Sequence, residues 1–294
     1  MMKAPMLILI LSIILAMAFF TLEERKVLGY SQLRKGPNKI AIMGVLQPIA
    51  DAAKLLTKTS IFPNQVNFYL FLLAPNISIS LSLLIWLILP SMLMFMNTPF
   101  SIIWFLILSS LTVYSILFSG WASNSKYSLI GALRALAQTI SYEVTMTLII
   151  LCYLLLWHTS SFKYLPMSSS FILHTLAPIW MIIALAETSR SPFDLPEGES
   201  ELVSGFNTEL SGPLFTFFFM AETLNILMMS VISTILLFPW PPLLSPLKFM
   251  TFAYFFIWVR SALPRLRYDM LMSLTWKTIL PFSLTLFMMA LLLS

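Results

Sequence analysis

Charged side chains are scarce in this sequence. Asp, Glu, Lys and Arg together make up only 10% of its 294 residues, whereas soluble domains carry roughly 25%. The shortage is also uneven, because no charged residue lies between Lys58 and Lys126. A surface that faces water needs more charge than this, so the composition excludes an ordinary soluble domain.

Cysteine and histidine are nearly absent as well. The single cysteine, Cys152, can form neither a disulfide framework nor an iron–sulfur cluster within this chain. The two histidines, His158 and His174, do not provide a pair of haem ligands on facing helices. The sequence also lacks a glycine-rich turn for a nucleotide, and its acidic residues lack the spacing of a calcium-binding loop. We therefore predict no metal site, no redox cofactor and no residue that catalyses a reaction without partner subunits.

Long hydrophobic runs fill the sequence instead, and 59% of the residues are hydrophobic. A membrane-spanning helix needs ~20 mostly apolar residues. Lipid cannot hydrogen-bond the backbone, so continuous runs of this kind must be helical. Eight segments qualify, at about 4–22, 68–90, 100–120, 142–158, 171–187, 212–236, 248–263 and 277–293. We predict an all-α membrane protein with about eight transmembrane helices, forming a single domain over residues 1–294.

The basic residues indicate which loops face inwards. Eight spans place loops 23–67, 121–141, 188–211 and 264–276 on one side of the membrane. Of the 17 Lys and Arg residues, all but Lys3, Lys163 and Lys248 lie in these loops or in the adjoining helix ends. Because such residues accumulate in cytoplasmic or matrix loops, we predict that these are the inner loops. The net charge of +5 then reflects membrane orientation, and we predict no nucleic-acid partner.

The first inner loop contains an amphipathic pattern. Between Ile42 and Lys58, apolar residues recur every three or four positions, and Gln47, Asp51 and Lys54 mark the opposite face. This periodicity predicts an amphipathic helix at the membrane interface, and Pro48 either kinks it or marks its start. Two roles remain open for this helix, a surface anchor and the floor of a cavity that faces a partner.

Acidic residues are concentrated in one region. Seven of the 12 Asp and Glu residues lie from Glu187 to Glu222, with Arg190 as the only cation among them. Loop carboxyls this close together raise one another's pKa, which favours proton exchange near neutral pH. Glu222 lies well inside an apolar segment, where an ionised side chain costs about 2.5–3.5 kcal/mol, and Glu143 lies near the start of another. We predict a proton path or a ligand site, while simple solvation remains open for the central loop carboxyls.

Five long motifs carry a family resemblance. They are EERKVLGYSQLRKGPNK (23–39), LQPIADAAKLL (46–56), ASNSKYSLIGALRALAQTISYEV (122–144), PFDLPEGESELVSGFNTEL (192–210) and WVRSALPRLRYDMLMSLTWKTILP (258–281). In amino-acid sequence and in order, and from one end of the chain to the other, these motifs resemble those of the NADH dehydrogenase subunit 1 family.

The resemblance implies a membrane subunit of the proton-pumping NADH:ubiquinone oxidoreductase, respiratory complex I, in the mitochondrial inner membrane. It implies eight spans, with the N-terminus on the outer side and the long loops facing the matrix. Two peripheral subunits would complete a chamber in which ubiquinone, the shared substrate, meets an iron–sulfur cluster. NADH, FMN and the iron–sulfur clusters would be held only by partner subunits, and other membrane-arm subunits would pump protons.

The resemblance also assigns roles to individual residues. Those assigned to the quinone chamber are Glu24, Arg25, Arg34, Asp51, Arg190, Asp194, Arg267 and Asp269. Those assigned to a proton relay are Glu143, Glu187, Glu197, Glu199, Glu201, Glu209 and Glu222. One departure is visible at Ser189, where the family usually has asparagine. An amide beside Arg190 is thereby lost, while the charges are kept.

Two other classes of protein remain as alternatives. An ion-coupled transporter would show an inverted repeat and broken helices that meet at the midplane, and no internal repeat is apparent. Within that class, the membrane subunits of hydrogenase-type complexes are the nearest relatives. A structural anchor for a soluble enzyme would explain the basic loops, but it would leave the buried position of Glu222 and the acidic cluster without a purpose.

Overall fold

The computed structural model describes residues 3–89, 100–162, 171–194, 205–238 and 244–293. Within these ranges the chain is helical and contains no strand, which confirms the all-α prediction. The helices are α1 Lys3–Ser31, α2 Gln47–Thr57, α3 Phe68–Ile88, α4 Ser101–Ala122, α5 Lys126–Trp157, α6 Phe171–Glu187, α8 Pro213–Leu237, α9 Ser245–Ala262, α10 Tyr268–Leu274 and α11 Leu280–Leu293. Shorter elements are the 3-10 turns η1 Ile42–Gly44 and η2 Gly205–Asn207 and the π-helical segment η4 Thr275–Ile279.

Six of the described helical stretches are long and apolar enough to cross a membrane. They are Leu7–Ser31, Phe68–Ile88, Ser101–Ala122, Lys126–Trp157, Pro213–Leu237 and Tyr268–Leu292. α6 contributes a shorter apolar helix, Thr175–Glu187, at the position predicted for the fifth span. α9 coincides with the predicted seventh span but is not among the six. The protein is therefore a helical membrane protein, with helices at all eight predicted positions.

Several helices extend beyond the apolar runs that predicted them. α5 begins at Lys126 rather than near residue 142, so most of the predicted loop 121–141 is helical instead. α1 likewise continues to Ser31, and the continuous helix Tyr268–Leu292 replaces most of the predicted loop 264–276. With 32 residues, α5 is ~48 Å long, more than the ~30 Å apolar core of a bilayer. Hydrophobicity thus predicts which residues lie in lipid. It does not predict where a helix ends, because a helix can continue into water as long as its backbone hydrogen bonds are satisfied.

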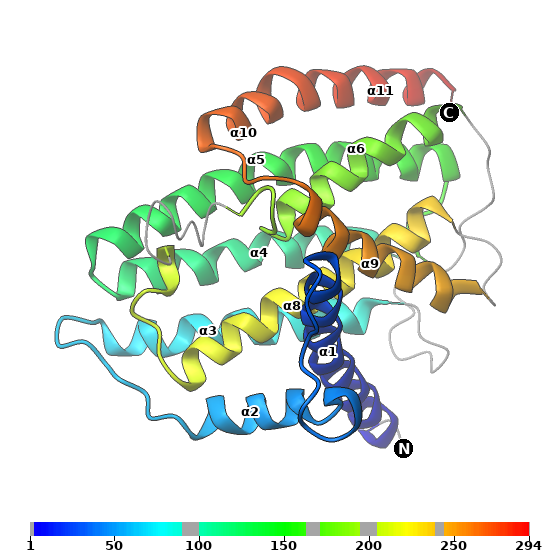
Figure 1. Ribbon diagram of the computed structural model, residues 1–294. Coiled ribbons are helices and arrows are strands. Elements are labelled where there is room, and N and C mark those ends of the chain that lie inside the picture. The colour runs from blue at the N-terminus through cyan, green and yellow to red at the C-terminus, as the bar shows by residue number, and fades with distance from the viewer. Residues whose placement is uncertain (1–2, 90–99, 163–170, 195–204, 239–243, 294) are drawn as a thin grey trace.

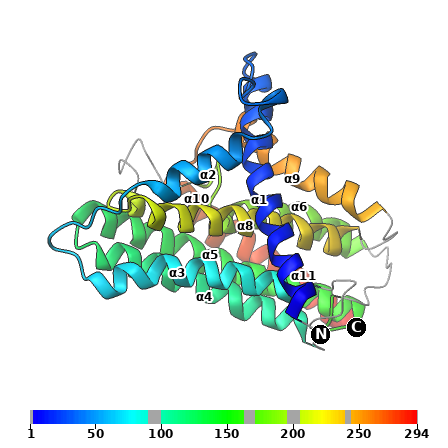
Figure 2. The ribbon, with the colours of Figure 1, turned by 90° about the horizontal axis from the view of Figure 1, so that it is seen from below.

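The helices form a bundle of roughly parallel rods. Figure 1 shows α11, α5, α4 and α3 side by side, with α6 next to α5 and α8 next to α3. In agreement with this view, α5 contacts α4, α6 and α11, and α3 contacts α4 and α8. The largest fully buried side chains of this bundle are Trp180, Tyr142 and Tyr153. α1 crosses the bundle steeply (Figure 2) and contacts α8 and α9.

The predicted amphipathic helix is present as α2, but it is shorter than predicted. It begins at Gln47, with Pro48 in its first turn, so Pro48 marks the start. Residues 42–44 form the separate turn η1, because Met43 and Gly44 both have positive φ angles. A Cβ atom at Gly44 would lie 2.3 Å from the Pro37 carbonyl oxygen, so this tight turn requires glycine. α2 therefore starts only after the turn has reversed the chain.

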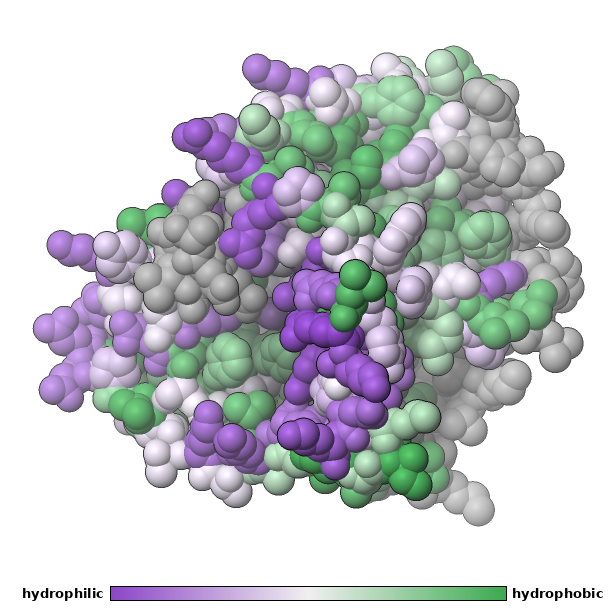
Figure 3. Space-filling model, viewed as in Figure 1, coloured by the Kyte–Doolittle hydropathy of each residue, from purple (hydrophilic) through white to green (hydrophobic). Residues whose placement is uncertain are grey.

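Polar and apolar surfaces are separated on the molecule. Figure 3 shows hydrophilic side chains gathered over the C-terminal part of α1 and along the left edge of the bundle, with hydrophobic side chains mainly towards α11 and α9. Leu11 on α1 and Met288 on α11 are 58% and 60% exposed, respectively. Exposed apolar surface of this extent is rare on soluble monomers, and it is what a helix bundle surrounded by lipid requires.

Candidate functional site

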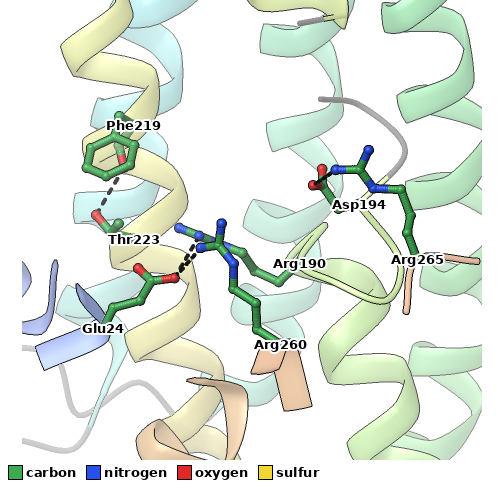
Figure 4. A network of polar contacts seen from close by, with 7 residues as sticks. All are labelled: Glu24, Arg190, Asp194, Phe219, Thr223, Arg260 and Arg265. Atoms are coloured by element: carbon green, nitrogen blue, oxygen red, sulfur yellow. Dashed lines mark hydrogen bonds and ion pairs between the residues drawn. The ribbon is translucent and has the colours of Figure 1, made fainter. Parts of the chain in front are cut away.

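A buried glutamate with two arginine partners forms the centre of the site (Figure 4). Glu24 Oε1 accepts hydrogen bonds from Nη1 of Arg190 at 3.1 Å and from Nη1 of Arg260 at 2.5 Å. Glu24 is only 8% exposed. Burial of an ionised carboxylate is unfavourable unless cations and hydrogen bonds compensate for it, and here two guanidinium groups do so.

Three distant chain segments bring these side chains together. Glu24 lies on the part of α1 that extends past the predicted span, Arg260 lies in the last turn of α9, and Arg190 lies in the turn after α6. A hydrogen bond of 2.8 Å from the Phe193 N–H to the Arg190 carbonyl closes that turn. Because α1 packs against α9, Glu24 and Arg260 meet although they are 236 positions apart.

A second ion pair fastens the same turn to the segment between α9 and α10. Arg265 Nη2 donates a hydrogen bond to Asp194 Oδ2 at 2.7 Å, and the Leu266 N–H donates to the Pro192 carbonyl at 2.9 Å. The other carboxylate oxygen, Asp194 Oδ1, is buried and has no hydrogen-bond partner among the described residues. An oxygen in this position can accept a hydrogen bond from a ligand.

A cavity of about 260 Å³ lies beside the Glu24 group. We call it the arginine cavity, and it is lined by Thr21, Glu24, Arg25, Leu28, Arg190, Phe219, Glu222 and Arg260. Ligand pockets for drug-sized molecules measure roughly 300–1,000 Å³, and a water molecule takes about 30 Å³ of liquid volume. The arginine cavity can therefore hold several waters or a small polar head group, but not a whole long-tailed ligand.

A second, smaller cavity of about 80 Å³ lies deeper in the bundle, between α3, α4, α5, α6 and α8. We call it the hydroxyl cavity, because its lining includes Ser78, Ser109, Thr112, Ser115 and Thr139. Each of these hydroxyl groups donates to a carbonyl of its own helix, so its oxygen can still accept a hydrogen bond from the cavity. Glu187 and Glu222 also line this cavity, and Glu222 lines the arginine cavity as well.

The other predicted relay residues lie in different surroundings. Glu143 lies on α5 and Glu187 is the last residue of α6, and these two helices pack against each other. Glu209 is half-buried and lies between η2 and α8. The remaining three, Glu197, Glu199 and Glu201, lie outside the described residues.

Two residues that the family resemblance assigns to the chamber, on α1 and α2, are joined by an ion pair. Arg25 Nη2 donates to Asp51 Oδ2 at 2.6 Å, and Gln47 Nε2 donates to Asp51 Oδ1 at 2.8 Å. The Arg25 and Asp51 side chains are 46% and 30% exposed. This pair is therefore partly open to solvent, and it connects the first membrane helix to the amphipathic helix at the edge of the arginine cavity.

Three further residues assigned to the chamber lie at the surface. Arg34 is exposed and donates to Gln32 at 3.0 Å. Arg267 and Asp269 pair with each other at 3.1 Å, but their side chains are 75% and 71% exposed. The structure does not bring these three into the group around Glu24.

Some residues of the site were not predicted as site residues from the sequence. In the sequence, Arg260 and Arg265 are recognisable only as positive charges that indicate the inner side of the membrane. In the structure, Arg260 pairs with Glu24 and Arg265 pairs with Asp194. Both arginines belong to the motif at 258–281, so the motif itself was the available signal. Among the described residues, no group of three or more His, Cys, Asp or Glu side chains is placed to hold a metal ion.

Comparison with known proteins identifies the family. A model of the family described as NADH dehydrogenase matches residues 4–291. The NADH-ubiquinone oxidoreductase chain 1 of Priodontes maximus is 50% identical over 297 residues, which cover 96% of this chain and 93% of that protein. The proteins of the same name from Murina florium and Paracentrotus lividus are 50% and 47% identical, covering 96% and 92% of this chain and 93% and 89% of theirs. The chain therefore belongs to the NADH dehydrogenase family.

Proposed function

We propose that this chain is the membrane subunit of the proton-pumping NADH:ubiquinone oxidoreductase that lines the quinone chamber and couples quinone reduction to proton movement. Its relatives are named NADH-ubiquinone oxidoreductase chain 1, which supports the overall reaction. The observation that carries the coupling is the position of Glu222, which lines both cavities. We place the protein in the mitochondrial inner membrane, with Glu24 and Asp194 towards the matrix. NADH, FMN and the iron–sulfur clusters are assigned to partner subunits.

The route for ubiquinone lies between α1 and α2 in this proposal. The isoprenoid tail of ubiquinone is apolar, and α2 exposes apolar side chains, among them Ile49 and Leu56, to more than half of their full extent. Leu28 and Phe219 add apolar surface within the arginine cavity. The head group would reach the interface with the peripheral subunits near the turn that carries Asp194, where electrons arrive from the partner's iron–sulfur cluster.

Quinone reduction creates a local demand for protons, since ubiquinone takes up two electrons and two protons to become ubiquinol. Asp194 and Arg190 would feel this change first, because they lie on the same turn. Two unit charges 8 Å apart interact by roughly 2 kcal/mol at an effective dielectric constant of 20. About 1.4 kcal/mol is enough to change a protonation ratio tenfold. A change of charge at the head group is therefore sufficient to disturb the protonation of neighbouring carboxyls.

The two cavities provide the path by which this disturbance would spread. Glu222 faces the arginine cavity on one side and the hydroxyl cavity on the other, where Glu187 lies. Glu187 in turn ends α6, which packs against α5, the helix that carries Glu143. We propose the order Glu222, Glu187, Glu143 for the relay, which continues to the pumping subunits. Glu209 is assigned to the relay as a half-buried carboxylate before α8, and Glu197, Glu199 and Glu201 from the sequence alone.

Neutralising Asp194 tests this proposal. Asp194→Asn should lower the rate of quinone reduction by NADH about tenfold or more, because a positioned proton-exchanging group typically contributes at least that much. Electron transfer from NADH to a water-soluble acceptor should stay unchanged, since it takes place in the partner subunits. Both rates are measured in the same membranes and normalised to assembled complex. Glu23→Gln, which removes an exposed carboxylate of α1, is the control. Equal loss of both rates in Asp194→Asn would refute the assignment to the quinone chamber.

A further inference from the structure

Gln138 has no role in the chamber or the relay as described, yet it is completely buried. It lies on α5, and its side chain reaches across to the turn that follows α6. Nε2 donates hydrogen bonds to the Ala186 carbonyl at 2.9 Å and to the Phe193 carbonyl at 2.7 Å. These carbonyls belong to the peptide groups that immediately precede Glu187 and Asp194. One amide nitrogen therefore holds the two backbone positions from which both carboxylates project.

We propose that Gln138 is a positioning residue that sets the placement of Glu187 and Asp194 relative to each other. This inference rests on the function proposed above, because it assigns a purpose to the relative positions of these two carboxylates. Gln138 itself does not touch the substrate in this proposal. It acts by keeping the backbone at Glu187 and the backbone at Asp194 at a fixed distance from each other.

The chemistry of the side chain fits this role. An amide nitrogen carries two neutral N–H donors, and both are used for the two carbonyls. Its own oxygen, Oε1, is buried without a hydrogen-bond partner among the described residues, which is unfavourable for a buried acceptor. The orientation of the amide therefore depends on the two donated bonds. No charged side chain could bridge two carbonyls here without adding a charge beside Glu187 and Asp194.

The surrounding contacts explain why the turn needs a bridge at its base. Its outer part is held by the pairs Arg190–Glu24 and Asp194–Arg265 and by the bond from Leu266 to Pro192. These contacts attach the turn to α1 and to the segment after α9, but they do not join its two ends. Tyr142, one helical turn after Gln138, packs its ring against Phe193 with centroids 5.9 Å apart. α5 thus anchors the end of the turn next to Asp194 by two neighbouring side chains.

The first test is Gln138→Met, which keeps the length and volume of the side chain but removes both donors. A displacement of about 1 Å can change a rate by up to a hundredfold. We expect the NADH-to-quinone rate per assembled complex to fall about tenfold, with the rate to a water-soluble acceptor unchanged. The control is Thr145→Val, because Thr145 is also fully buried on α5 and its hydroxyl bonds the Tyr142 carbonyl of the same helix. It should leave both rates unchanged.

A double variant separates positioning from general damage. If Gln138 acts through the turn, Gln138→Met combined with Asp194→Asn should reduce the quinone rate by less than the product of the two single effects. Multiplication of the two effects would show that Gln138 acts independently of Asp194, and it would overturn the inference. The glutamate side chain of Gln138→Glu has nearly the same shape but lacks the amide donors, so the quinone rate of this variant should fall at least as far as that of Gln138→Met. If Gln138→Met does not assemble, Gln138→Glu is judged by the same criteria.

The remaining outcomes distinguish this inference from the function on which it rests. A full quinone rate in Gln138→Met, together with impairment in Asp194→Asn, overturns the positioning role and leaves the proposed function standing. An Asp194→Asn variant with full activity refutes the proposed function and this inference with it. Loss of assembly in both Gln138 variants, with Thr145→Val assembled, would show a purely structural role and also overturn the inference.

Discussion

Glu24→Gln is the most informative single change at the centre of the site. It removes the charge that holds Arg190 and Arg260 together, while it keeps the side-chain length and one acceptor oxygen. The neighbouring Glu23 offers a matched control, because it is exposed on the same helix. Both variants thus remove one negative charge from α1, but only Glu24→Gln removes it from the buried face that contacts the arginines. Only Glu24→Gln should therefore impair quinone reduction.

The expected magnitude follows from the burial of each partner. Removing one member of a buried ion pair costs about 3–5 kcal/mol. The Glu24 and Arg190 side chains are only 11% and 15% exposed, so their pair approaches the lower end of this range. Arg260 is 40% exposed, and water replaces its lost partner, so it adds at most about 1 kcal/mol. A neutral hydrogen bond to the new glutamine returns about 1 kcal/mol, which leaves a net loss of about 3 kcal/mol.

A loss of this size lowers the equilibrium constant for holding both arginines against residue 24 on the order of a hundredfold. Quinone reduction by NADH, measured over a range of concentrations of a short-tailed quinone, should therefore show a strongly reduced rate per assembled complex in Glu24→Gln. The rate to a water-soluble acceptor should be preserved. Glu23→Gln should behave as the unaltered protein. If the two variants have the same quinone kinetics, the ion-pair group does not shape the chamber, and this reasoning is refuted.

Two further changes test the edges of the site. Glu222→Gln should lower the number of protons moved per NADH oxidised, since Glu222 lines both cavities; a pH-sensitive dye in sealed vesicles measures this ratio, and an unchanged ratio would contradict the relay. Asp51→Asn should reduce the quinone rate only about fivefold at most, and less at high salt than at low salt, because its partly exposed pair with Arg25 is worth no more than about 1 kcal/mol. A loss as large as that of Glu24→Gln would mean that Asp51 contacts the quinone directly.

The class of fold could be predicted, and several candidate site residues could be proposed, because both depend on local chemistry. Runs without charge predict membrane helices whatever their neighbours, and Pro48 marks the start of α2 through its missing N–H and fixed φ angle. Glu222 was recognisable because an acid inside an apolar segment needs a reason to be there. In the structure, Glu222 lines both cavities.

The pairings within the site could not be predicted, because they join residues that are far apart in the sequence. Glu24 and Arg260 meet only through the packing of α1 on α9, and hydropathy contains no information about which helices are neighbours. The extents of α1 and α5 were underestimated for a related reason, since polar residues end an apolar run without ending a helix. Gln138 was overlooked because a neutral amide next to an apolar run gives no signal of its own. Its proposed role depends on one carbonyl of α6 and one carbonyl of the turn after α6.

The charges around the arginine cavity fit the proposal that a single carboxylate, Glu222, connects the chamber to the membrane interior. Three cations, Arg25, Arg190 and Arg260, line the cavity together with two acids, Glu24 and Glu222. Glu24 already has two of the cations as direct partners. In the proposed mechanism, negative charge that arrives on the quinone competes with Glu222 for the same cations. Glu222 also lines the hydroxyl cavity. In this mechanism, a Glu222 carboxylate that loses its cation contacts in the arginine cavity takes up a proton from the hydroxyl cavity, so charge moves from one cavity to the other.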